Sequence, residues 1–95
     1  MKVLVSKISL FIPHSESLKD KRRVLKAIKD RVWSKFRASI SEVEDQDSRQ
    51  HAVLGLSFVS NDASLLDSVM NKTVDLIEAS FPGFLEGFDY TIENY

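Results

Sequence analysis

The sequence contains no cysteine, one tryptophan, two histidines and only five glycine and proline residues together. Without cysteine there can be no disulfide framework, no thiolate nucleophile and no Cys-ligated metal. Neither His14 nor His51 has a second ligand at metal-binding spacing, so we expect no metal site. The chain also lacks a G-x-S-x-G, P-loop or G-x-G-x-x-G motif, and no serine stands beside a base that would activate it. These absences predict a protein that is not an enzyme and has no cofactor and no small-molecule substrate.

A long hydrophobic run is missing as well. The apolar stretch VLVSKISLFI is interrupted by Lys7 and is much too short to cross a membrane. We therefore expect a cytoplasmic protein with no membrane partner. Ninety-five residues suffice for one domain with its own core, and no repeat, linker or low-complexity segment divides them. The sequence predicts a single domain over residues 1–95.

Hydrophobic periodicity predicts six secondary-structure elements. They are a strand at residues 3–12, a helix at 18–36, strands at 38–43 and 51–60, a helix that begins after Asp62 and ends before Pro82, and a strand at 87–95. Ser17 is the expected N-cap of the first helix and Asp62 that of the second. The order β-α-β-β-α-β is the split βαβ plan. We therefore expect an α+β, ferredoxin-like fold, in which a four-stranded antiparallel sheet carries both helices on one face.

Charge is distributed very unevenly along the chain. The net charge is only −1, yet nine of the 13 Lys and Arg residues lie between Lys19 and Arg37, together with only two acids, Asp20 and Asp30. That segment carries a charge of +7 and the remainder carries −8. Such segregation predicts a positive surface and a negative surface within one domain.

The first predicted helix breaks two local rules of helix electrostatics. Its basic residues follow one another at contact spacing, and four of them crowd the first turns, where the helix dipole disfavours each cation by roughly 0.3–1 kcal/mol. Segments that break such rules are often functional, and free N–H groups at a helix N-terminus suit phosphate. Arg22, Lys26, Lys29 and Trp33 form a row at positions i, i+4, i+7 and i+11 of the helix. The tryptophan at the end of this row could stack on a base or a guanidinium. We expect RNA or a ribosomal particle to bind the following residues: Lys19, Lys21, Arg22, Arg23, Lys26, Lys29 and Trp33.

Two other interpretations of this helix stay open. Lys and Arg side chains commonly coat helices that face only solvent, and acids of the second helix (Asp67, Asp75 and Glu78) could neutralise the cations. The cations could also bind an acidic protein partner.

The sheet face opposite the helices is a second candidate surface. Strand alternation places on it an apolar set that includes Phe11, Val53 and Val59, among small polar residues. The stacking aromatics of an RNA-recognition motif are absent from this face, where Phe11 is the only obvious aromatic. We therefore expect Phe11, Val53 and Val59 to contribute to a self-association face, and a homodimer formed through this face or an edge strand is the alternative function.

Three segments, IPHSESLKDKRRVLK, SISEVEDQD and AVLGLSFVSND, resemble in order and spacing the YlxP-like family, a bacterial domain family of unknown function. The resemblance implies a ferredoxin-like fold and a role near the ribosome or its RNA, because family members typically come from gene clusters of transcription, translation-initiation and ribosome-maturation factors. It supplies no catalytic residues. The match of SLKDKRR falls on Ser17–Arg23, whereas Arg49 lies in a loop where family members commonly have a tryptophan.

Overall fold

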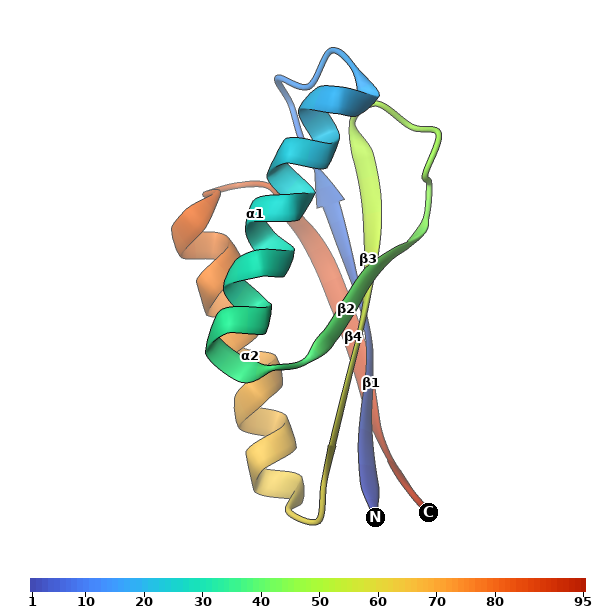
Figure 1. The fold of residues 1–95 in the computed structure, drawn as a ribbon, viewed down its shortest axis with the longest axis vertical. Coiled ribbons are helices and arrows are strands. Elements are labelled where there is room, and N and C mark those ends of the chain that lie inside the picture. The colour runs from blue at the N-terminus through green and yellow to red at the C-terminus, as the bar shows by residue number, and fades with distance from the viewer.

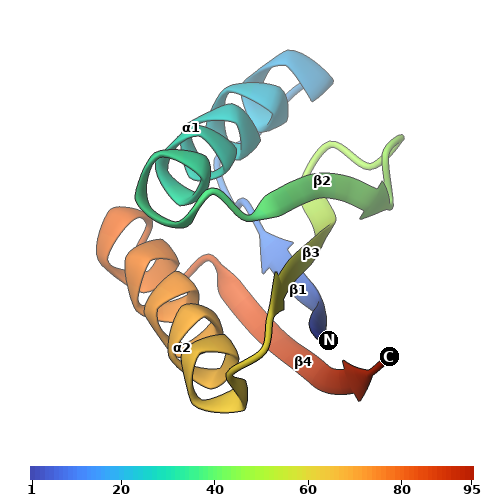
Figure 2. The ribbon, with the colours of Figure 1, turned by 60° about the horizontal axis from the view of Figure 1, so that its bottom comes forward.

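The computed structural model describes residues 1–95 and consists of a sheet with two helices on one of its faces (Figure 1). The elements are β1 (Lys2–Phe11), α1 (Leu18–Phe36), β2 (Ser39–Glu44), β3 (His51–Ser60), α2 (Ala63–Ser80) and β4 (Leu85–Asn94). The strands lie in the order β2-β3-β1-β4, and all neighbours are antiparallel. The predicted ferredoxin-like fold is therefore confirmed. Figure 2 shows both helices on one side of the sheet and no element on the other.

The helix starts follow the predicted caps. The Ser17 hydroxyl accepts the Asp20 N–H at 3.1 Å, and the Asp20 carboxylate accepts the Glu16 N–H at 3.1 Å. The first bond satisfies an N–H group that the first turn of the helix leaves free, and the second fixes the residue before the cap. Asp62 caps α2 in the same way, by accepting the N–H groups of Ser64 and Leu65. Because side chains encode both starts, the sequence predicts them closely.

The core lies between the sheet and the two helices. It contains 15 buried apolar residues: Leu4, Ile8, Leu10, Ile12, Leu25, Ile28, Val32, Ala38, Ala52, Leu54, Leu56, Leu66, Val69, Met70 and Ile77. In β1 the buried positions alternate with exposed or half-buried ones, as expected for a sheet covered on one side. Neither helix is both apolar enough and long enough to cross a membrane.

One charged side chain is buried inside this layer. Lys21, in the first turns of α1, is only 1% exposed, and its ammonium group lies 2.8 Å from the Glu42 carboxylate of β2. The same group donates hydrogen bonds to three backbone carbonyls, those of Asp45 (2.9 Å), Gln46 (3.4 Å) and His51 (3.1 Å). A buried ammonium group is tolerated only with such partners. Lys21 therefore ties α1 to β2 and to the loop between β2 and β3.

Replacing Lys21 with methionine should destabilise the protein strongly. The substitution leaves the Glu42 carboxylate and the carbonyl oxygens without their donor, so we expect a loss of about 3 kcal/mol in the free energy of unfolding. The double variant Lys21→Met/Glu42→Gln should recover part of the loss, because it removes the uncompensated charge. Urea denaturation measures both.

The matched control is Lys26→Met. Lys26 lies on the same helix and pairs with Asp30 at 2.6 Å, but both side chains are largely exposed. An exposed pair contributes less than about 1 kcal/mol. Equal losses in Lys21→Met and Lys26→Met would contradict the structural role of Lys21.

Candidate nucleic-acid interface

The basic residues of α1 and its C-cap are almost all accessible and mostly unpaired. Of the nine cations between Lys19 and Arg37, Lys21 is buried and Lys26 forms an ion pair with Asp30. The other seven make no ion pair: Lys19, Arg22, Arg23, Lys29, Arg31, Lys35 and Arg37. Six of them are exposed and Lys29 is half-buried. This surface, which we call the basic face, carries a concentrated positive charge.

Lys21 is a correction to the predicted site. Its ammonium group is enclosed by Glu42 and three backbone carbonyls, so it has no access to an external anion. The remaining six predicted residues lie at least partly at the surface: Lys19, Arg22, Arg23, Lys26, Lys29 and Trp33. The predicted set therefore loses one member to the interior of the fold.

The acids of α2 make no direct contact of opposite charge with the basic face. Asp67 accepts a hydrogen bond from the Tyr90 hydroxyl at 2.9 Å, and this bond raises the pKa of Tyr90 above its ordinary value. Neither Asp67 nor Asp75 nor Glu78 forms an ion pair with α1. Asp75 does line a hollow with Lys35 near the end of α1, so it lies beside one cation of the basic face without pairing with it.

The two glutamates of β2 are already paired. Glu42 meets Lys21 at 2.8 Å and Glu44 meets Lys7 of β1 at 2.8 Å, so both glutamates of β2 have cationic partners. The hydrogen bond and the negative charge of Glu44 also raise the pKa of Lys7. The acidic side chains of β2 thus do little to offset the positive charge of α1.

Trp33 borders a hollow between α1 and β2. Its side chain is 52% exposed, although a tryptophan is usually largely buried. The guanidinium of Arg37, the C-cap of α1 with a φ of 58°, lies over the indole at 5.3 Å from the ring centroid. The hollow has a volume of about 290 Å³ and is lined by Lys29, Asp30, Trp33, Ala38, Ser39 and Ile40. An aromatic ring, a cation and the beginning of an edge strand therefore meet at one place.

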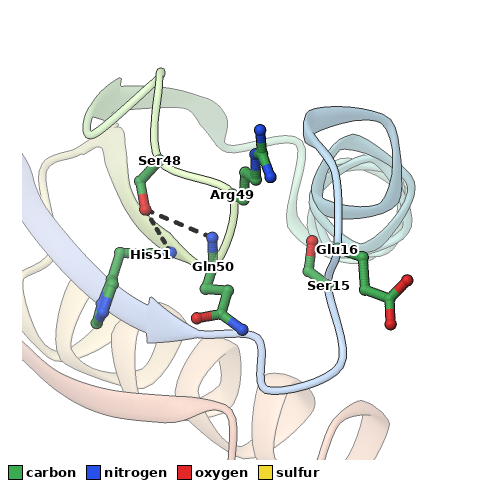
Figure 3. Close-up of a pocket in the computed structure, with 6 residues that line it drawn as sticks. All are labelled: Ser15, Glu16, Ser48, Arg49, Gln50 and His51. Carbon is green, nitrogen blue, oxygen red and sulfur yellow. Dashed lines mark hydrogen bonds between the residues drawn. The ribbon is translucent and has the colours of Figure 1, made fainter.

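A larger cleft lies between the loop before α1 and the loop before β3 (Figure 3). Its volume is about 520 Å³, and it is lined by Ser15, Glu16, Ser48, Arg49, Gln50 and His51. The hydroxyl of Ser48 accepts the N–H groups of Gln50 and His51, while that of Ser15 donates to the Ser17 carbonyl. The imidazole of His51 is bonded instead to Glu86, at 3.2 Å. Neither serine hydroxyl is thus paired with the imidazole as a nucleophile is with its base.

The open sheet face exposes several aliphatic side chains. Val59 is 57% exposed, and Val5 and Val43 are each 43% exposed. Of the other two residues predicted for this face, Val53 is half-buried, and Phe11 is half-buried with its ring against that of His51 at a centroid distance of 5.0 Å. The exposed apolar area therefore comes mainly from valines.

Sequence reasoning missed three of these features. Lys21 lies three residues after Leu18 and four before Leu25, which is the spacing of the buried stripe, so its burial had a visible signal. Arg37 lies four residues after Trp33, which is contact spacing on a helix. Val43 continues the outward alternation of Ser39 and Ser41, so its exposure also had a visible signal, whereas the register shift that breaks the alternation at Glu44 had none.

The fold is shared with proteins of unrelated sequence. A de novo designed protein with a ferredoxin fold superposes with a TM-score of 0.59 at 13% identity, covering 100% of this chain and 87% of the designed one. A mutant of SnoaB, a cofactor-independent oxygenase from Streptomyces nogalater, superposes with a TM-score of 0.55 at 6% identity, covering 99% of this chain and 92% of that one. At such identities the likeness concerns the fold alone.

Proteins related in sequence identify the family of this chain. The uncharacterized protein YlxP of Bacillus subtilis (strain 168) is 41% identical over 66 residues, which cover 70% of this chain and 71% of YlxP. A family described as "Protein of unknown function (DUF503)" matches residues 3–87. The chain belongs to this family, the YlxP-like proteins, whose function is unknown.

Proposed function

We propose that this protein is a non-catalytic accessory factor of the cytoplasm that binds RNA or a ribosomal particle through the basic face of α1. The observation that carries the proposal is the set of seven cations of the basic face that make no ion pair, in a chain with a net charge of −1. Arg22 and Arg23 are both exposed in the first turns of the helix, where the helix dipole already disfavours positive charge.

An anionic polymer is the partner that would reduce the repulsion between the cations of α1. Neighbouring cations of α1 repel one another, and phosphate groups placed among them would remove that repulsion. Binding of this kind depends on the release of counterions from the nucleic acid, so it is strong at low salt and weak at high salt. It also depends little on base sequence, because phosphates carry no sequence information.

Reversing two charges on the basic face should greatly weaken RNA retention. In Arg22→Glu/Arg23→Glu we expect a large loss of RNA binding at low salt. We also expect the binding constant to depend less on salt: for a single strand, the slope of log K against the logarithm of the salt concentration should become less steep by about 0.7 for each phosphate contact that is removed. Filter binding over a salt series measures both quantities, and circular dichroism checks that the variant is folded.

The control is Lys2→Glu/Lys7→Glu, which changes the net charge by the same amount in β1, at residues that line no hollow with a cation of α1. It should bind nearly as the unmodified protein does. If both double variants lose binding equally, retention reflects only net charge, and the basic face is not the binding surface.

A second candidate function is self-association through the open sheet face. The observation that favours it is the exposure of Val5, Val43 and Val59 on a face that no helix covers (Figure 2). Contiguous exposed apolar area on a small protein commonly marks a site of protein–protein contact. A partner copy would cover these valines while leaving the helices of both copies outside.

Val5→Asp should abolish a dimer that forms in this way. A carboxylate placed in the centre of the buried face would be desolvated without a partner, so we expect a shift to the monomer in sedimentation velocity. The matched control is Leu65→Asp, since Leu65 of α2 has a similar exposure of 44% but lies on the helical side. A monomeric unmodified protein, or a dimer that persists in Val5→Asp, would rule out this interface.

A further inference from the structure

We infer that the hollow beside Trp33 holds one unpaired base of a single-stranded RNA, whose phosphates run along the exposed cations of α1. The inference rests on the proposed function and adds to it the strandedness of the ligand and the position of a stacked base. It follows from the side chains that meet at the hollow, from the row of cations that leads to it, and from the edge strand that forms its other wall.

The hollow has the size and chemistry of a subsite for one planar group. Its volume of about 290 Å³ is at the lower end of the range of roughly 300–1,000 Å³ for ligand pockets. Trp33, Ala38 and Ile40 supply apolar surface, and Lys29 and Ser39 supply hydrogen-bond donors. Trp33 already accepts a planar partner within the protein, because the guanidinium of Arg37 lies over its ring. A nucleobase is likewise flat, with an apolar face and a polar edge.

The other wall of the hollow is an edge strand. β2 pairs only with β3, so alternate N–H and C=O groups along its outer edge have no strand partner. Ser39 and Ile40, at the beginning of β2, line the hollow. Free backbone groups of this kind can bond the edge of an inserted base, which is how unpaired bases are recognised.

A row of side chains connects the hollow to the N-terminal half of α1. Arg22, Lys26, Lys29 and Trp33 lie at i, i+4, i+7 and i+11, and the row spans about 16 Å at a rise of about 1.5 Å per residue. At about 3.4 Å per nucleotide of a stacked strand, this length matches about five nucleotides. Lys26 is engaged by Asp30, so Arg22 and Lys29 are the free cations of the row. Phosphates along this row would place a base at Trp33.

These features favour a single strand over a duplex or an acidic peptide. In a duplex the bases are stacked and paired, so none can enter the hollow without first being unpaired. An acidic peptide would satisfy the cations but has no aromatic face to match the indole. The exposed tryptophan therefore distinguishes the three ligands.

The intrinsic fluorescence of the protein tests the inference directly, because Trp33 is the only tryptophan in the chain. We expect titration with an oligouridylate of about ten nucleotides to quench the fluorescence strongly and saturably. A duplex RNA of the same length and a polyglutamate of equal charge should quench it little. Equal quenching by the duplex or by polyglutamate would overturn the inference.

Variants separate stacking from charge. Trp33→Ala should weaken binding of the oligouridylate about tenfold and binding of the duplex less than about twofold, whereas Trp33→Tyr, which keeps an aromatic ring, should retain most of the affinity. Tyr95→Ala is the matched control, because Tyr95 is also an exposed aromatic residue but lies at the C-terminus. If all three variants bind the oligouridylate like the unmodified protein, Trp33 does not stack on a base.

The two proposals fail in distinguishable ways. If RNA binding is lost in Arg22→Glu/Arg23→Glu but Trp33 responds equally to single and double strands, the basic face still binds RNA and only the base subsite is wrong. If the oligouridylate and the duplex are both left unbound at low salt, the proposed function itself is wrong.

Discussion

The ammonium group of Lys21 is surrounded by four oxygen atoms, one from a carboxylate of β2 and three from the backbone around the β2–β3 loop. Because a buried ammonium group needs acceptors for its three N–H donors, these contacts hold the first turns of α1 close to the end of β2. The hollow lies at the other end of α1, where Arg37 and Ala38 connect the helix directly to the beginning of β2, so α1 is held against β2 at both ends. The exposed cations of the helix, Trp33 and the edge of β2 are thereby presented together.

Ion pairing of acidic side chains also explains how a chain with a net charge of −1 presents a positive surface on α1. The two glutamates of β2 are engaged by Lys21 and Lys7, and Asp30 is engaged by Lys26. Glu42 and Asp30, the two carboxylates that contact cations of α1, thus each have a cationic partner. Glu16, directly before α1, and Asp45, whose carbonyl accepts from Lys21, form no ion pair, but the seven unpaired cations of the basic face outnumber them.

The sequence predicts the fold well because its signals are local. Alternation in β1, the caps Ser17 and Asp62, and the stripe of Leu25, Ile28 and Val32 each need only neighbouring residues to be interpreted. The position of Lys21 on that stripe was visible, but its partners were not, because Glu42 reaches it only after the sheet has formed. The hollow beside Trp33 was not visible either, since the spacing of a helix gives the face of a residue and not the direction in which the next strand, which begins at Ser39, leaves the helix.

Gly55 of β3 shows how closely two distant positions of the sheet depend on each other. Val43 of β2 lies beside Gly55, and a β-carbon added at residue 55 would approach Val43 Cγ1 to 2.8 Å. An alanine at position 55 therefore requires Val43 to shift or a smaller residue at position 43. The two positions should consequently vary together, and a family member with a side chain at the first should carry a smaller residue at the second.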